Sequence, residues 1–292
     1  HSIAIMDKNG RLVVQAALTL PIHIASMGGL MKCVLEKYGE DIHEGDIFIA
    51  NDPHTAGGTH LPDINYAMPI FIEGEIVAFI CNIAHHADIG GMVPGSMAGG
   101  MSEIYQEGLR IPLIRLFDKG VLQTDIMDIL MLNVRVPEER RGDHNAQIAS
   151  CRLGVRRFME VVDVYSLPSV LSAFDEIISR TALRMRAAIT EIPDGVYTFN
   201  DFMDADGINT YDIPICLTLT VKGERIYLDF DGTSSQVRGN INTTMNAVQA
   251  SVNYALIAAL DSEMPSNQGV LDVVDINCAP GTLLNCVFPA PV

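Results

Sequence analysis

The feature that most constrains the fold is a pair of β-rich segments joined by a tight turn. Residues 66–72 and 76–83 are rich in isoleucine and phenylalanine, and residues 73–74 form the turn between them. Two such runs around a short glycine-containing turn predict an antiparallel hairpin. The second run ends directly at His85 and His86, so a rigid strand end holds polar side chains in a fixed position.

The remaining segments alternate between strand and helix patterns, and their character changes near residue 190. Before that point, we expect β-rich runs at residues 3–6, 12–14 and 47–50, helices at 29–38, 122–134, 145–162 and 169–189, and a charged loop at 137–143. After it, we expect strands at 196–202, 213–221 and 225–230 and a helix at 242–260. The sequence therefore predicts an α+β fold with mixed β-sheets and packed helices in two sub-domains. Residues 1–190 would form an α+β sub-domain that carries the metal site described below. Residues 191–292 would form a β-rich sub-domain with one packed helix.

Composition limits the class of protein. Hydrophobic residues make up 48% of the 292 residues and only 19% are charged, which is typical of a globular chain with large cores. The formal net charge of −17 argues against a nucleic-acid partner. No apolar run approaches the roughly 18–20 residues of a membrane span, and no secretory segment opens the chain.

The cysteines and the chain ends carry two further expectations. The six cysteines are scattered without a C-x-x-C pair, so we expect free thiols in a reducing cytoplasm. Because the chain begins at His1 and ends without a polar tail, we expect a segment of a longer polypeptide.

Residues 51–91 are unusually dense in histidine, aspartate and glycine. Four of the eight histidines lie there, and two of them, His60 and His85, are each followed three residues later by an aspartate, Asp63 and Asp88. Imidazole and carboxylate groups bind zinc, manganese or iron, and glycine lets the backbone approach an ion or a substrate closely. The pattern predicts a divalent metal site built from two loops. The alternative is a set of hydrogen-bonded surface histidines in ordinary turns.

Three further features are candidates for binding. The glycine-rich residues 91–102 follow the histidines directly, which favours a substrate-contacting loop over a flexible linker. Arg110 suits bidentate contact with an anionic substrate group, although a structural ion pair explains it nearly as well. Five arginines in this acidic chain form either a phosphate- or partner-docking face or a solvated helix surface: Arg140, Arg141, Arg152, Arg156 and Arg157.

Several common catalytic motifs are missing from the sequence. It has no G-x-S-x-G nucleophile motif, no cysteine beside a histidine, and no phosphate-cradling G-x-x-x-x-G-K-[ST] loop. Residues 204–207 look like the start of a calcium loop but lack its later ligands. What remains is a histidine–aspartate metal site that can polarise a carbonyl or activate water.

Seven motifs in this sequence resemble those of the hydantoinase B family, and they occur in the family's order. They are residues 51–53, 57–63, 85–91, 94–97, 107–112, 146–149 and 229–233. The family includes the B-type subunits of ATP-dependent N-methylhydantoinases, the C-terminal half of 5-oxoprolinases, and the alpha subunits of acetone and acetophenone carboxylases. The resemblance runs from about residue 2 to the end of the chain.

This resemblance implies one part of a heteromeric enzyme. A hydantoinase A-type partner subunit would bind ATP and phosphorylate the amide or enolate oxygen of the substrate. The B-type part would carry one divalent metal (Zn, Mn or Fe), with His60, Asp63 and His85 as its ligands. The family has a further acidic ligand just before the position that corresponds to His1.

Three more residues are candidates for catalytic roles beside that metal. His86 or Asp88 would orient a metal ligand or carry a proton, and Arg110 would hold an anionic group of the substrate. We therefore expect the metal-containing subunit of a hetero-oligomeric, ATP-dependent cyclic amidase that acts on a lactam or hydantoin. One alternative is the alpha subunit of an ATP-dependent ketone carboxylase, and another is a non-catalytic, metal-stabilised docking scaffold.

Overall fold

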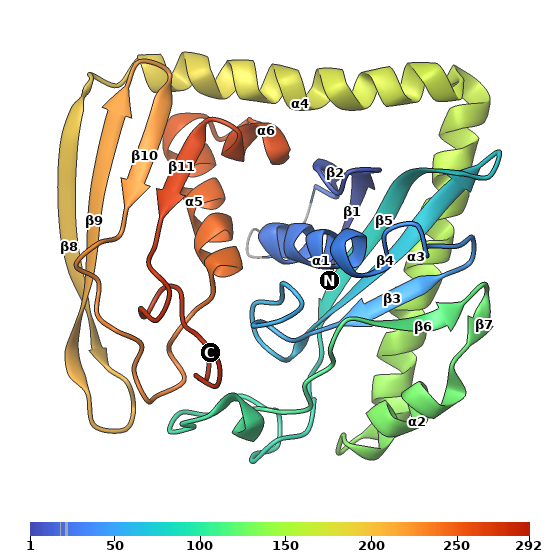
Figure 1. Cartoon of the computed structure of the whole chain (residues 1–292), viewed down its shortest axis with the longest axis horizontal. Helices are drawn as coiled ribbons and strands as arrows, with labels where there is room; N and C mark the ends of the chain where they lie inside the picture. The colour runs from blue at the N-terminus through green and yellow to red at the C-terminus, as the bar shows by residue number, and fades with distance from the viewer. Residues whose placement is uncertain (18, 21–22) are drawn as a thin grey trace.

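The computed structural model describes residues 1–17, 19–20 and 23–292. Two β-sheets form the framework of this part of the chain (Figure 1). Within these residues, the first sheet has seven strands in the order β2-β1-β5-β4-β3-β6-β7, with antiparallel pairing throughout. The strands are β1 (Ser2–Asp7), β2 (Leu12–Gln15), β3 (Ile47–Ala50), β4 (Asp63–Ile72), β5 (Glu75–His85), β6 (Ile114–Asp118) and β7 (Val121–Leu122). The predicted hairpin is confirmed as β4 and β5, and it lies at the centre of this sheet.

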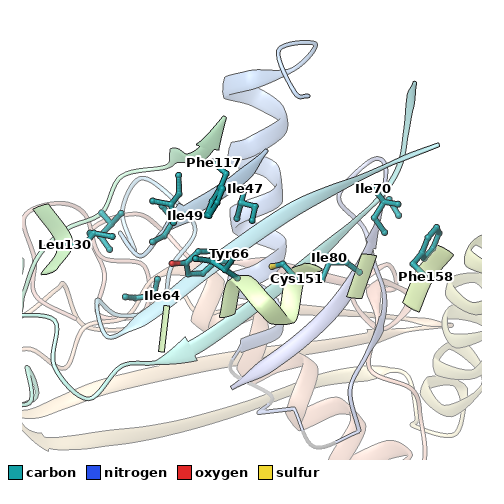
Figure 2. Close-up of a cluster of buried hydrophobic side chains, with 14 of the residues drawn as sticks. Ile47, Ile49, Ile64, Tyr66, Ile70, Ile80, Phe117, Leu130, Cys151 and Phe158 are labelled. Carbon is teal, nitrogen blue, oxygen red and sulfur yellow. The ribbon is translucent and has the colours of Figure 1, made fainter. Parts of the chain in front are cut away.

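Helices cover both faces of the first sheet. Helix α1 (His23–Tyr38) packs on one face and α3 (Pro137–Tyr165) on the other. Along β5, Phe79 joins the core beside α1 while Ile80 joins the core beside α3, as side-chain alternation in a strand requires. Because both faces are buried, β5 is an almost continuous hydrophobic run. Figure 2 shows the core on the α3 side, where Cys151 of α3 lies close to Ile80.

Helix α3 begins at Pro137, so the charged loop predicted at residues 137–143 is wrong. Proline is favoured in the first turn of a helix, where its missing N–H costs nothing. Glu138 and Glu139 lie in the same turn and complement the positive end of the helix dipole. The run of charges is therefore a helix start.

The other predicted helices also differ from their predicted bounds, and for α1 and α2 the structure shows the reason. Helix α1 begins at His23 and not at residue 29, because Gly28 and Gly29 lie inside the helix and do not interrupt it. Helix α2 (Thr124–Leu132) is shorter than the predicted 122–134, because the residues before it pair as β7 with β6. None of the helices in the described part of the chain is both long and apolar enough to cross a membrane.

The second sheet is mixed and lies on the far side of α1 from α3 (Figure 1). Its order is β11-β10-β9-β8, with β10 and β11 parallel and the other pairs antiparallel. The strands are β8 (Gly195–Ala205), β9 (Tyr211–Lys222), β10 (Arg225–Asp229) and β11 (Val274–Asn277). The first three of these were predicted, and β11 was not. With the helices on both sheets, they confirm the predicted α+β class.

Helix α4 (Leu167–Thr190) spans the two sheets (Figure 1). Near its end, Met185 and Ile189 are buried in the core of the second sheet, together with side chains of α5 (Met245–Leu260) and α6 (Gln268–Leu271). The last turns of α4 therefore pack with the part that follows them, and the sub-domain boundary near residue 190 stays a prediction.

Candidate functional site

The register of the β4–β5 hairpin brings the three predicted metal ligands together. Asp63, the first residue of β4, lies opposite His85, the last residue of β5. His60 lies one turn before β4, and its carbonyl accepts a 3.1 Å hydrogen bond from the backbone N–H of Asp63. The ring centroids of His60 and His85 are 5.0 Å apart. Strand pairing thus joins two loops that are well separated in the sequence.

Asp63 is the buried centre of this group, with 2% of its surface exposed. Thr59 Oγ1 donates a 2.7 Å hydrogen bond to Oδ2, and His60 Nε2 lies 3.1 Å from the same oxygen. His23 Nε2 lies 3.5 Å from the other oxygen, Oδ1, which has no hydrogen-bond partner among the described residues. Burial raises the pKa of Asp63, but the imidazoles of His23 and His60 lower it by more, so the pKa lies well below its usual range. Asp63 is therefore ionised at any working pH.

His23 is the member of this group that the sequence did not reveal. It is buried in the first turn of α1, and Ser2 Oγ lies 2.7 Å from its Nδ1. No spacing pattern links His23 to the dense window at residues 51–91, because the contact forms only when α1 packs across the sheet. We therefore count His23 with His60, Asp63 and His85 as one polar group, the Asp63 cluster.

The Asp63 cluster fits a divalent metal in its chemistry. Burial lowers the pKa of His85, and His60 beside it lowers it further, which favours the neutral imidazole that metals bind. The unpartnered Oδ1 of Asp63 is a buried acceptor that a cation would satisfy. As the side chains lie, however, no three His, Cys, Asp or Glu residues of the described chain are placed to hold one ion. The metal site therefore stays a prediction.

His86 faces the opposite side of the sheet from the Asp63 cluster. Adjacent residues of an extended chain point to opposite faces, and His86 is buried against α3. Its Nε2 donates a 2.8 Å hydrogen bond to Gln147 Oε1, and its ring lies 4.7 Å from that of His144. Burial lowers the pKa of His86, and the hydrogen bond to Gln147 offsets only part of this effect. These contacts anchor the strand end on α3, and a catalytic role for His86 stays a prediction.

Asp88 fastens the glycine-rich loop that follows the histidines. Its carboxylate accepts backbone N–H bonds from Gly90 and Gly95 at 3.0 Å each and from Arg135 at 3.1 Å, and the Arg135 side chain adds a 2.9 Å ion pair. Burial raises the pKa of Asp88, but these donors lower it to about 2. Through these contacts, Asp88 holds the glycine-rich loop in its conformation. Its role in carrying a proton stays a prediction.

Arg110 forms the structural ion pair that was the alternative interpretation of this residue. Its Nε donates to Asp52 Oδ2 at 2.5 Å, and its guanidinium lies over the rings of Tyr105 and Phe288, at 5.5 and 4.6 Å from their centroids. The carboxylate of Asp52 also accepts the backbone N–H of Thr55 at 2.8 Å. Arg110 therefore holds the loop after β3, and its predicted contact with a substrate anion has no support in these interactions.

A cavity of about 450 Å³ opens beside His60. Part of the glycine-rich loop, including Ser96 and Gly99, lines it, which places that predicted substrate loop next to the Asp63 cluster. Glu107 lines it as well, is buried, and accepts a 2.7 Å hydrogen bond from the backbone N–H of Val292. Burial raises the pKa of Glu107 to about 8. The sequence pattern did not single out Glu107, although it begins the motif from which Arg110 was selected.

Comparison with known proteins identifies relatives of this chain. The model of the family described as hydantoinase B/oxoprolinase matches residues 1–292. The B-type subunit of a putative D-/L-hydantoinase from Pseudomonas sp. (strain NS671) is 31% identical, over 99% of this chain and 51% of that protein. The caprolactamase beta subunit of Pseudomonas jessenii is 31% identical, over 100% of this chain and 50% of its own length. The chain therefore spans about half the length of these relatives.

Two solved structures share the fold. The crystal structure of the ATP-dependent caprolactamase from Pseudomonas jessenii matches with a TM-score of 0.92 at 31% identity, over 99% of this chain and 50% of that chain. The nucleotide-free structure of acetone carboxylase matches with a TM-score of 0.88 at 23% identity, over 97% of this chain and 39% of that chain. At the lower identity, the likeness to acetone carboxylase concerns the fold alone.

Proposed function

Since this chain belongs to the hydantoinase B/oxoprolinase family, we propose that it forms the B-type part of an ATP-dependent enzyme that hydrolyses cyclic amides. The observation that carries the proposal is the Asp63 cluster beside the cavity that also holds Glu107. The 31% identity to a caprolactamase beta subunit and to the B-type part of a putative hydantoinase supports a lactam or hydantoin as substrate. It favours the amidase over the ketone carboxylase, whose support is a likeness of fold.

The chemistry divides naturally between two protein parts. A cyclic amide resists hydrolysis because resonance between its nitrogen and carbonyl must be broken. Phosphorylation of the amide oxygen removes that resonance and leaves an imidate-like carbon that water can attack. This sequence has no phosphate-cradling loop, so we assign ATP binding and phosphorylation to an A-type partner subunit in a hetero-oligomer.

Residues of this chain fit the hydrolytic half of that reaction. The buried carboxylate of Asp63 holds His60, which lines the cavity, in place. Glu107, whose pKa of about 8 keeps it protonated near neutral pH, can donate a proton to the leaving nitrogen. The glycine-rich loop, fastened by Asp88, forms the wall across which the ring would lie.

We expect His60, Asp63 and His85 to hold one divalent ion, with His23 beside them. Such an ion lowers the pKa of bound water to about 7 in favourable sites and so supplies hydroxide at neutral pH. Elemental analysis of the purified complex is expected to find the ion in the wild-type protein and to find it lost in His60→Ala. His43→Ala is the matched control, because His43 also lies near carboxylates but outside the cavity. Equal metal content in all three proteins would contradict the site.

Turnover assays test the function itself. The chain purified with its A-type partner is expected to hydrolyse ATP only in the presence of a lactam or hydantoin, and the chain alone is expected to have no ATPase activity. Ring-opened product that forms without added bicarbonate supports the amidase. Bicarbonate-dependent carboxylation of a ketone would establish the carboxylase instead, and metal-loaded complex without either activity would favour a docking scaffold.

A further inference from the structure

A basic groove runs along one side of α3, on the face of the first sheet opposite to the Asp63 cluster. It lies between α3, α2 and the β6–β7 hairpin and has a volume of about 660 Å³. Phe117, Met127 and Ile148 form its apolar floor, and each of these side chains is buried. Arginines line its length, so the groove pairs a hydrophobic base with a cationic rim.

Only three of the five arginines noted in the sequence belong to this groove: Arg141, Arg152 and Arg156. Arg140 turns inward and pairs with Glu139 and Asp143, and Arg157 pairs with Glu160 outside the groove. Within the described residues, the side chains of the three groove arginines form neither an ion pair nor a hydrogen bond. The Arg152 guanidinium instead lies over the Phe117 ring, at 4.9 Å from its centroid.

The spacing of these arginines decides what size of ligand they suit. At about 1.5 Å per residue along a helix, Arg141 and Arg156 are roughly 22 Å apart along the axis. Arg152 and Arg156 are one turn apart and can share one carboxylate, whereas Arg141 needs another. A single phosphate or a small ring cannot reach all three. A segment of protein can, because its side chains repeat along a comparable length.

The charge of the molecule decides the chemistry of that segment. The chain carries a formal charge of −17, so three unpaired arginines are a local exception on an acidic body. A nucleic acid would meet repulsion from the rest of the surface, while an acidic segment of limited length meets only the groove.

We propose that this groove binds an acidic segment of a partner protein, with carboxylates on the three arginines and apolar side chains on the floor. The proposal rests on the proposed function in one respect, namely that the chain works together with a partner subunit. It adds the surface and the chemistry by which that partner is held.

Site-specific cross-linking in the assembled complex tests the proposal. A photo-reactive benzoylphenylalanine replaces Asn145, which is exposed and lines the groove, and the cross-linked peptide is identified by mass spectrometry. The same substitution at exposed Asp163, further along α3 and outside the groove, is the control. The expected product at Asn145 is an acidic segment of the partner. A neutral or basic segment, a second copy of this chain, bound nucleic acid, or no cross-link would overturn it.

Charge reversal gives the second measurement. Arg152→Glu with Arg156→Glu is expected to weaken partner binding about tenfold or more, with a loss that shrinks as salt is added. Arg157→Glu with Arg180→Glu is the control, because it changes the net charge equally at exposed arginines that pair within their own helices. Similar affinities for the two double variants would contradict the proposal.

The two proposals fail in different ways. If the groove variant assembles normally and the complex still hydrolyses its lactam, the groove assignment is wrong and the function stands. If the groove variant loses its partner but the wild-type complex shows no ATP-dependent ring opening, the function is wrong and the groove assignment stands.

Discussion

Replacement of Gln147 by leucine is expected to be among the most destabilising single changes on α3. Gln147 is buried at the interface between α3 and the first sheet. Its Nε2 donates to the carbonyl of Ile64 at 2.8 Å and to Asn82 Oδ1 at 3.0 Å, and its Oε1 accepts from His86 Nε2 at 2.8 Å. One side chain therefore satisfies a strand carbonyl, a side-chain amide and an imidazole.

The cost follows from the groups that lose their partners. Gln147→Leu leaves Asn82 Oδ1 and His86 Nε2 buried without partners, at about 1–3 kcal/mol each. The Ile64 carbonyl loses one of its donors but still faces Ala84 across the β4–β5 pair. Asn82 Nδ2 still donates a 2.9 Å hydrogen bond to the backbone carbonyl of residue 147, so only the Oδ1 of that amide loses its partner. Leucine contributes about 1–2 kcal/mol of apolar burial in return. We expect a net loss of about 1–4 kcal/mol in the free energy of unfolding.

Urea unfolding of the full chain followed by circular dichroism measures this loss. Asn145→Leu is the matched control, because it makes a similar substitution at an exposed position on the same helix and is expected to change stability by no more than about 0.5 kcal/mol. If Gln147→Leu lost less than about 1 kcal/mol, the network would not be the tight, dry interface that the distances describe, and the reasoning would be refuted.

Two further predictions concern α1 and the cavity. Gly28→Ala is expected to raise thermal stability by up to about 1 kcal/mol, because the added Cβ meets nothing within 4 Å in a helix interior. Gly29→Ala is expected to lower thermal stability, because its Cβ would lie 2.8 Å from the Gly57 Cα. If Gly29→Ala were the more stable of the two variants, the packing of α1 would be contradicted. The pKa of Glu107 is raised from 4.5 to about 8, so between these pH values the folded state holds a proton that the unfolded state releases. The free energy of unfolding is therefore expected to fall as the pH rises from about 4.5 to 8, by at most about 1.4 kcal/mol per pH unit. Glu107→Gln keeps the acceptor for the Val292 N–H and is expected to flatten that part of the stability profile; an unchanged slope would show that Glu107 is not its source.

Local pattern was enough to predict much of the chain's secondary structure. The hairpin of β4 and β5, the strands β8 to β10 and the helix α4 were all recognised from hydrophobic periodicity and turn residues. Such signals depend on a few neighbouring residues in the sequence, so they can be recognised without knowledge of the fold. The short strands β6, β7 and β11 were missed, since each is defined by a partner strand and not by its own pattern.

In the candidate site too, some contacts follow from local sequence and others only from the tertiary structure. His60 and Asp63 are three residues apart in the sequence, and in the structure a single turn brings them together. Strand register then added His85, and helix packing added His23, neither of which any local spacing determines. Glu107 reached the cavity through the loop that precedes β6.

Tertiary contacts also decided how side chains of similar chemistry are used. His85 and His86 are adjacent, yet one faces the Asp63 cluster and the other is bonded to Gln147 on α3. Asp88 binds loop amides and Arg110 binds Asp52, so both are already engaged in holding loops. The sequence by itself determined which chemical groups the site region contains. Only the packing of helices on both faces of the sheet decided which of them meet, because burial on opposite faces separates neighbours in the chain and joins residues far apart in it.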